Sequence, residues 1–158
     1  MEHIINDLVT LLQTKSPTGH TEEAITLVEK RFNDLGLTSY RTNKGALIAT
    51  LEGQDSSQAI TLSAHVDTLG AVVKEITGDG YLKLSQIGGY AWTTIEGEHV
   101  SIETINDTYY TGTVLTNVAS SHVHGAKTNS TKRNEHTLQV RIAEKVFTKD
   151  DVLKLGIQ

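Results

Sequence analysis

The stretch Ala59-Ile60-Thr61-Leu62-Ser63-Ala64 leads directly into His65-Val66-Asp67-Thr68-Leu69-Gly70. The apolar run over residues 59–64 predicts a strand that ends at His65. In open α/β sheets, ligands bind beyond the carboxyl ends of strands, which is where His65 and Asp67 would lie. A spacing of two places both side chains on one face of an extended backbone. The stretch therefore predicts a candidate site at residues 65–67, and together with the helices that precede it predicts an α/β fold.

The pair His65 and Asp67 has two interpretations. One imidazole nitrogen can bind a metal ion while a nearby carboxylate fixes the tautomer and orientation of the ring. The same two residues can instead be a hydrogen-bonded histidine at a strand end, followed by an Asx-turn at Asp67. Because His-x-Asp is common by chance, the spacing alone favours the second interpretation.

Two amphipathic helices are expected before this stretch. The first has its apolar residues at helical spacing and ends at Ser16-Pro17-Thr18-Gly19, because proline disfavours helical geometry at the residue before it. The second begins near Glu22 and Glu23, whose carboxylates suit the positive end of a helix dipole, and stops at Gly36. Its expected buried stripe comprises Ala24, Ile25, Leu27, Val28, Phe32 and Leu35.

Strand patterns follow the helices and continue after residue 70. A hairpin with Asn43-Lys44-Gly45 at its turn is expected to join strands at residues 38–41 and 46–51. Beyond Ala71 the pattern is all-β, with turn signals at Gly78-Asp79-Gly80 and Asn106-Asp107, a polar loop at 125–135 and a short last helix at 149–155. The expected strands lie at residues 72–77, 81–85, 100–105, 109–115, 118–124 and 138–142. Several short strands at this spacing suggest a small barrel.

Composition excludes several classes of protein. Among 158 residues, 19 are acidic and 14 are basic, so the net charge of −5 argues against nucleic-acid binding. The absence of cysteine excludes disulfides, thiolate zinc sites and a cysteine nucleophile. No run approaches the ~18 apolar residues of a membrane span, and the first residues lack the basic and apolar regions of a secretion signal. We therefore expect a soluble cytoplasmic protein without a membrane partner.

Residues 64–71 resemble the first metal-ligand motif of the co-catalytic metallo-aminopeptidases of the tetrahedral, deblocking type. That family includes glutamyl aminopeptidases and proteins once labelled endoglucanases. The resemblance continues in order through Ser16-Pro17-Thr18-Gly19, residues 43–49, Ile87-Gly88-Gly89, the segment from Val100 onward and residues 144–157. It implies that residues 1–70 are the N-terminal part of a catalytic α/β sandwich domain. It also implies that residues 71–158 are an inserted small β-barrel, incomplete at its C-terminal end, that serves oligomerisation.

The resemblance also implies a chemistry. His65 matches a terminal ligand of one of two divalent metal ions, zinc or cobalt, and Asp67 matches the catalytic carboxylate that steadies this histidine. In the family, the paired metals lower the pKa of a bound water and polarise the scissile carbonyl, while a glutamate acts as general base. The implied substrate is a short peptide with a free α-amine. The implied assembly is a homo-oligomer, either a dimer or a larger assembly of dimers.

One departure from the family limits this interpretation. The family's bridging aspartate, glutamate pair, further carboxylate and distal histidine all follow the inserted barrel, beyond Gln158. We therefore expect an N-terminal fragment that is inactive alone. An alternative is a non-catalytic oligomerisation or binding module, although its N-terminal part would expose a sheet edge and apolar faces. A third relationship, to metal carboxypeptidases and deacylases, is disfavoured because the barrel begins immediately after Gly70.

Other candidate residues carry weaker signals. His122-Val123-His124 could present two imidazoles on one strand face, although an exposed strand is the plainer interpretation. Trp92 near Tyr90 fits an exposed interface anchor and a barrel core equally well. Ser120-Ser121 lacks the Gly-x-Ser-x-Gly pattern of a nucleophile elbow, and Gly88-Gly89 is too short for a phosphate-binding loop. The remaining histidines are read as surface residues: His3, His20, His99 and His136.

Overall fold

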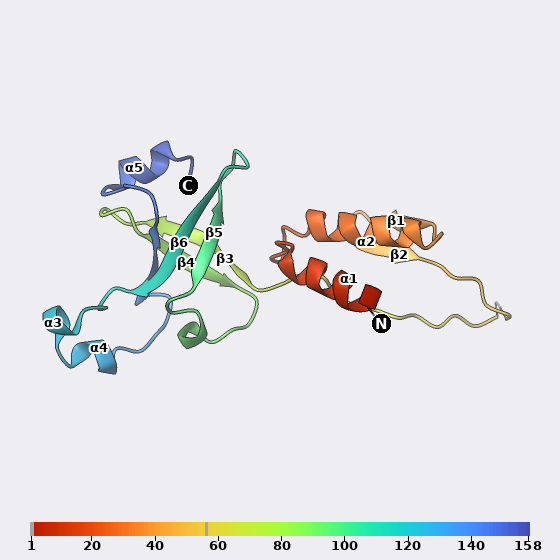
Figure 1. Cartoon of the computed structure of the whole chain (residues 1–158), viewed down its shortest axis with the longest axis horizontal. Helices are drawn as coiled ribbons and strands as arrows, with labels where there is room; N and C mark the ends of the chain where they lie inside the picture. The colour runs from red at the N-terminus through yellow and green to blue at the C-terminus, as the bar shows by residue number, and fades with distance from the viewer. Residues whose placement is uncertain (1, 56) are drawn as a thin grey trace. The chain divides into compact units, whose positions relative to one another are not determined.

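The computed structural model describes residues 2–55 and 57–158 of the chain (Figure 1). The chain forms two compact units, the first extending to Gly70 and the second comprising Ala71–Gln158. No helix among the described residues is long and apolar enough to cross a membrane.

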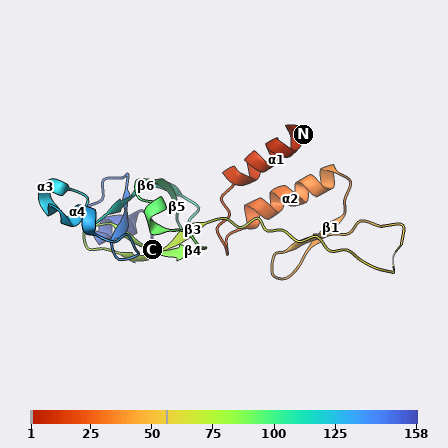
Figure 2. The ribbon, with the colours of Figure 1, turned by 90° about the horizontal axis from the view of Figure 1, so that it is seen from below.

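The first unit contains two helices and one hairpin. Helix α1 spans Glu2–Gln13, α2 spans Glu22–Asp34, and the antiparallel strands β1 and β2 span Ser39–Arg41 and Leu47–Ala49. Figure 2 shows α2 lying between α1 and the hairpin. Two helices beside a short sheet give this unit the mixed α/β character that the sequence predicts.

Arg41 fastens the hairpin to α2. Its Nε donates to Glu29 Oε2 over 3.1 Å, its Nη2 donates to Thr26 Oγ1 over 3.0 Å, and its Nη1 pairs with Glu22. The hydrogen bonds to Glu29 and Glu22 raise the pKa of Arg41 above its usual value. A planar guanidinium can satisfy all three partners at once, so one side chain sets the approach of β1 to α2.

The predicted strand at residues 59–64 is wrong. This segment is irregular, and Ile60 and Leu62 each expose 93% of their surface. A strand requires a neighbour to pair with its N–H and C=O groups, and no described segment pairs with this one. The predicted buried stripe of α2 forms only in part: Ala24 is buried and Leu35 is exposed, while the other four members are half-buried.

The second unit is built on a five-stranded sheet in the order β3-β4-β7-β6-β5. Its strands are β3 (Gly70–Ile76), β4 (Leu82–Ile87), β5 (His99–Glu103), β6 (Tyr109–Thr116) and β7 (Leu138–Ile142). Both predicted turns occur: Thr77 N–H donates to Tyr81 O over 2.9 Å, and Thr104 N–H donates to Thr108 O over 2.9 Å. In this order β3 and β5 are the edge strands, so closure of the sheet into a barrel remains a prediction.

The core of the second unit lies along the sheet and beneath α5 (Lys149–Lys154). Alternate residues of β6 and β7 point into it, as the period of two requires. The buried core consists of Ile76, Leu82, Leu84, Ile102, Val114, Leu138, Val140, Ile142, Val152 and Ile157. Val152 brings α5 onto this core, and Figure 1 shows α5 at one end of the sheet with α3 and α4 at the other.

The segment after β6 differs from its prediction. Residues 118–124 do not form a strand: α3 spans Ser121–His124, and α4 (Lys127–Ser130) lies within the predicted loop. Arg133 holds this segment, because its Nε and Nη2 bind both carboxylate oxygens of Glu96 over 2.6 and 3.1 Å. Its Nη1 also donates to the carbonyls of Thr128 and Thr131. The carbonyls of Thr128 and Thr131 thus find a side-chain partner in the Arg133 guanidinium.

Candidate functional site

The candidate site lies in the first unit, where residues 65–68 run beside the linker between α1 and α2. Pro17 and Thr68 form a parallel bridge, and Thr68 N–H donates to Ser16 O over 2.6 Å. Ser16 is fully buried. The linker thus fixes the backbone immediately after Asp67.

Gly70 permits this close approach. A Cβ at Gly70 would lie 2.7 Å from Pro17 Cβ, well inside normal contact distance. Only a residue without a side chain leaves room for the proline ring here.

The structure brings His65 and Asp67 together. His65 Nδ1 lies 3.0 Å from Asp67 Oδ1 and 3.1 Å from the Asp67 carbonyl oxygen. The second carboxylate oxygen, Oδ2, accepts a hydrogen bond of 2.7 Å from Thr18 Oγ1. The hydrogen bond from the Thr18 hydroxyl, with a lesser contribution from the neighbouring His65, holds the pKa of Asp67 below its usual value. Asp67 is therefore a carboxylate at neutral pH.

This arrangement leaves the other ring nitrogen of His65 available. If Nδ1 carries the proton and donates it to Asp67, Nε2 presents a lone pair to a cation. The His65 side chain is 81% exposed, so a ligand can reach Nε2 from solvent.

His65 and Asp67 together fit a single ligand position of a metal site, and they do not form a complete site. No group of three or more His, Cys, Asp or Glu side chains that could hold a metal occurs in the described part of the chain. Because a bound metal needs several protein ligands, His65 and Asp67 supply a first ligand and its orienting carboxylate.

The other predicted candidates do not form a site. His122 and His124 lie on α3 rather than on a strand, and a separation of two turns them about 200° apart around a helix axis. They therefore do not share a face. Trp92 is partly buried against the core and meets Tyr90 edge-on at 5.9 Å between ring centroids, which favours the core interpretation.

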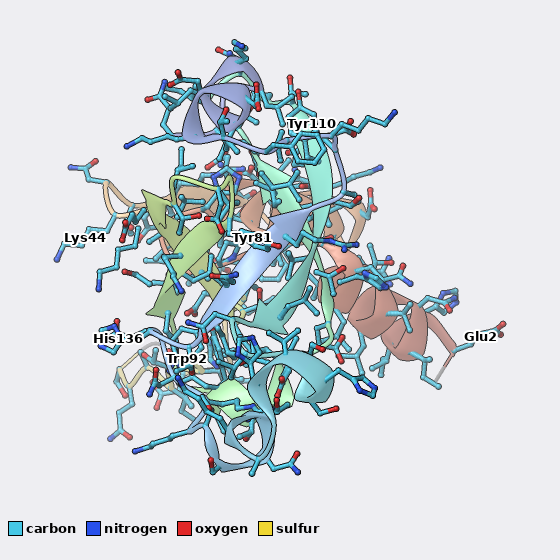
Figure 3. All side chains as sticks on the ribbon, turned by 90° about the vertical axis from the view of Figure 1, so that its left-hand side faces the viewer. Glu2, Lys44, Tyr81, Trp92, Tyr110 and His136 are labelled. Carbon is cyan, nitrogen blue, oxygen red and sulfur yellow. The ribbon has the colours of Figure 1, made fainter. Side chains whose placement is uncertain are left out.

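A shallow, open depression lies beside Trp92 in the second unit. Figure 3 shows Trp92 and His136 at the end of this unit opposite Tyr110. The lining residues are Ser85, Gln86, Trp92, Asn134, Glu135 and His136. Glu135 pairs with His136 over 3.5 Å and with Lys74 over 3.3 Å, so its charge is balanced within the surface.

Sequence reasoning missed the contribution of Thr18. The Ser16-Pro17-Thr18-Gly19 segment was expected to end a helix, and nothing in its pattern indicates a partner 49 residues away. A threonine beside a proline linker is a common surface feature, so no local signal distinguishes this one.

The fold is that of solved aminopeptidases. The TET aminopeptidase of a marine sediment thaumarchaeon superposes with a TM-score of 0.85 at 16% identity, covering 100% of this chain and 43% of that chain. The Pyrococcus horikoshii TET1 peptidase, whose structure is described as assembling into a tetrahedron or a large octahedral shell, gives a TM-score of 0.74 at 22% identity. That match covers 96% of this chain and 43% of that one. At these identities the likeness defines the fold.

The sequence defines the family. Residues 45–158 match the M42 glutamyl aminopeptidase family, and the chain belongs to it. The putative aminopeptidase YhfE of Bacillus subtilis (strain 168) is 43% identical over 154 residues, which are 98% of this chain and 43% of that protein. The putative aminopeptidase SgcX of Escherichia coli (strain K12) is 27% identical, over 96% of this chain and 39% of that protein.

The predicted resemblance is therefore confirmed. The chain spans about two fifths of the length of these curated relatives and corresponds to an N-terminal portion of them. M42 enzymes are peptidases that generally depend on metal ions.

Proposed function

We propose that this chain contributes His65 as a metal ligand to a cytoplasmic aminopeptidase that removes N-terminal residues from short peptides. The observation that supports this most directly is the contact of 3.0 Å between His65 Nδ1 and Asp67 Oδ1 in a chain of the M42 family. An exposed imidazole with one nitrogen held by a carboxylate is the arrangement that metal-ligating histidines use.

The two residues have separate roles in this proposal. His65 Nε2 would hold one of two divalent metal ions, zinc or cobalt, which when bound would activate a water molecule and polarise the scissile carbonyl. Asp67 accepts the Nδ1 proton, which fixes the ring orientation and makes Nε2 a better ligand. Its Oδ1 is occupied by His65 and its Oδ2 by Thr18, so Asp67 acts through the histidine.

The two units have different roles. We assign residues 1–70 to the catalytic domain and residues 71–158 to an inserted β-barrel that supports a homo-oligomer. The similar TET1 peptidase, which can assemble into a tetrahedron or a large octahedral shell, supports the homo-oligomer. The remaining metal ligands and the general base would come from residues outside this chain, so we expect residues 1–158 alone to be inactive.

The test is hydrolysis of aminoacyl 4-nitroanilides by the protein expressed from its gene, with Zn²⁺ or Co²⁺ supplied. We expect His65→Ala to abolish both hydrolysis and bound metal, while His3→Ala on the exposed face of α1 retains both. A substrate with an acetylated amine should not be cleaved. Full activity and metal content in His65→Ala would overturn the proposal. Stable oligomers that bind no metal and cleave no substrate would instead favour the non-catalytic module.

A further inference from the structure

We infer that Thr18 is a positioning residue for His65 and acts through Asp67. The inference rests on the proposed function in one respect, namely that His65 is a metal ligand. Its basis is a continuous hydrogen-bonded chain: Thr18 Oγ1 to Asp67 Oδ2 over 2.7 Å, and Asp67 Oδ1 to His65 Nδ1 over 3.0 Å.

The direction of this chain follows from its chemistry. Asp67 is ionised and can only accept hydrogen bonds, so Thr18 must donate its hydroxyl proton to Oδ2. His65 must likewise donate from Nδ1 to Oδ1 when its ring is neutral. A carboxylate held at one oxygen can rotate about its Cβ–Cγ bond, whereas one held at both oxygens is fixed. Thr18 therefore fixes the plane of the carboxylate, which is the nearer of the two acceptors at His65 Nδ1.

Thr18 is itself held in place, although its side chain is exposed. Thr68 N–H donates to Ser16 O, and His20 N–H donates to Pro17 O over 2.8 Å, so the backbone is hydrogen-bonded on both sides of Thr18. The β-branched side chain also has few rotamers. A hydroxyl on this fixed backbone points at Oδ2 without the entropy loss that a long surface side chain would suffer.

The consequence concerns Nε2. With the carboxylate plane fixed, the Nδ1–H tautomer is favoured and the Nε2 lone pair faces solvent. Without the Thr18 hydroxyl, the carboxylate can turn away, and the Asp67 carbonyl oxygen, 3.1 Å from Nδ1, is then the remaining acceptor of the two. The preference for the Nδ1–H form becomes weaker, so part of the neutral rings can place the proton on Nε2, where it blocks a metal ion. The residue thus prepares a ligand before any metal arrives.

The test uses two variants of nearly equal shape. Thr18→Val removes the hydroxyl and keeps the branch, whereas Thr18→Ser keeps the hydroxyl. Long-range ¹H–¹⁵N spectra of residues 1–158, recorded without metal at a pH where the ring is neutral, report the tautomer of His65 directly. We expect the Nδ1–H form in the wild type and in Thr18→Ser, and a mixture of both tautomers in Thr18→Val. Equal tautomer populations in all three proteins would overturn the inference. Thr18→Ala repeats the comparison if the valine variant fails to fold.

A second measurement separates this inference from the proposed function. Titration of the protein expressed from its gene with Zn²⁺ alone should show about tenfold weaker binding for Thr18→Val, the lower end of the range for residues that orient metal ligands. Thr18→Ser should restore it. If His65→Ala leaves zinc binding unchanged, the metal-ligand role fails, and the tautomer spectra still decide whether Thr18 positions the ring. If His65→Ala abolishes zinc binding and Thr18→Val does not alter it, the positioning role of Thr18 fails.

Discussion

Replacing Gly70 with alanine should disturb the candidate site indirectly, through Pro17 and the linker that carries Thr18. The new Cβ would lie 2.7 Å from Pro17 Cβ, and carbon atoms in good contact are about 3.5 Å apart, so the two segments must separate by roughly 0.8 Å. If the linker takes up this shift, the 2.7 Å hydrogen bond from Thr18 to Asp67 lengthens to roughly 3.5 Å, beyond the range for O–H···O bonds. The backbone at Gly70 is not in the left-handed region, so no strain of that kind adds to this contact.

The expected effect on stability is about 1–3 kcal/mol, the usual cost of overpacking. Urea unfolding followed by the amide signals of α2 reports the first unit, and the His65 tautomer reports the site. Gly53→Ala is the matched control, because a Cβ there meets its nearest neighbours at 3.7 and 3.9 Å. We expect Gly70→Ala to unfold at lower urea and to shift the tautomer. If Gly70→Ala matches Gly53→Ala in both measurements, the linker does not position Asp67.

Three further predictions concern the second unit. Gly112→Ala places a Cβ 2.5 Å from Val140 Cγ1 in the centre of the sheet, so it should cost about 1–3 kcal/mol, measured by urea unfolding with Trp92 fluorescence; an unchanged midpoint would contradict the packing described. Thr148→Ala removes the N-cap of α5 and should cost about 1 kcal/mol by the same measurement. The Thr148 hydroxyl lowers the pKa of Asp151 in the folded protein. The ionised Asp151 carboxylate therefore stabilises the fold above the unfolded pKa of about 3.9, and this contribution is lost as the pH falls through the folded value. Asp151→Asn should therefore weaken the loss of stability on acidification, and an identical acid profile would argue against this reasoning.

The first unit presents apolar side chains that the described residues do not cover. Ile4 and Leu12 on α1 each expose 68% of their surface, and the segment around Ile60 and Leu62 is exposed throughout. The apolar residues of α1 have the spacing of an amphipathic helix, and residues 59–64 are rich in residues that favour β-strands. Both patterns predict that these apolar side chains are buried, but the described residues do not cover them. The strand prediction for residues 59–64 was incorrect because no described segment pairs with that stretch.

The sequence by itself determined the features whose causes are local. Gly78-Asp79-Gly80 and Asn106-Asp107 form turns because their residues accept the required backbone angles, as Asp107 does with a φ of 56°. The motif at residues 64–71, together with the other matching segments in order along the chain, was enough to indicate the family. The alternation in β7 likewise predicts which of its side chains are buried.

Only the tertiary structure decided the features that depend on distant partners. A strand exists when another segment pairs with it, so residues 59–64 are irregular although their composition favours a strand. The separation of Thr18 and Asp67 by 49 residues hides their hydrogen bond from any local pattern. Gly70 and Pro17 are likewise linked by steric contact alone. Local backbone preferences therefore determine the turns, whereas contacts between distant segments determine how His65 is held.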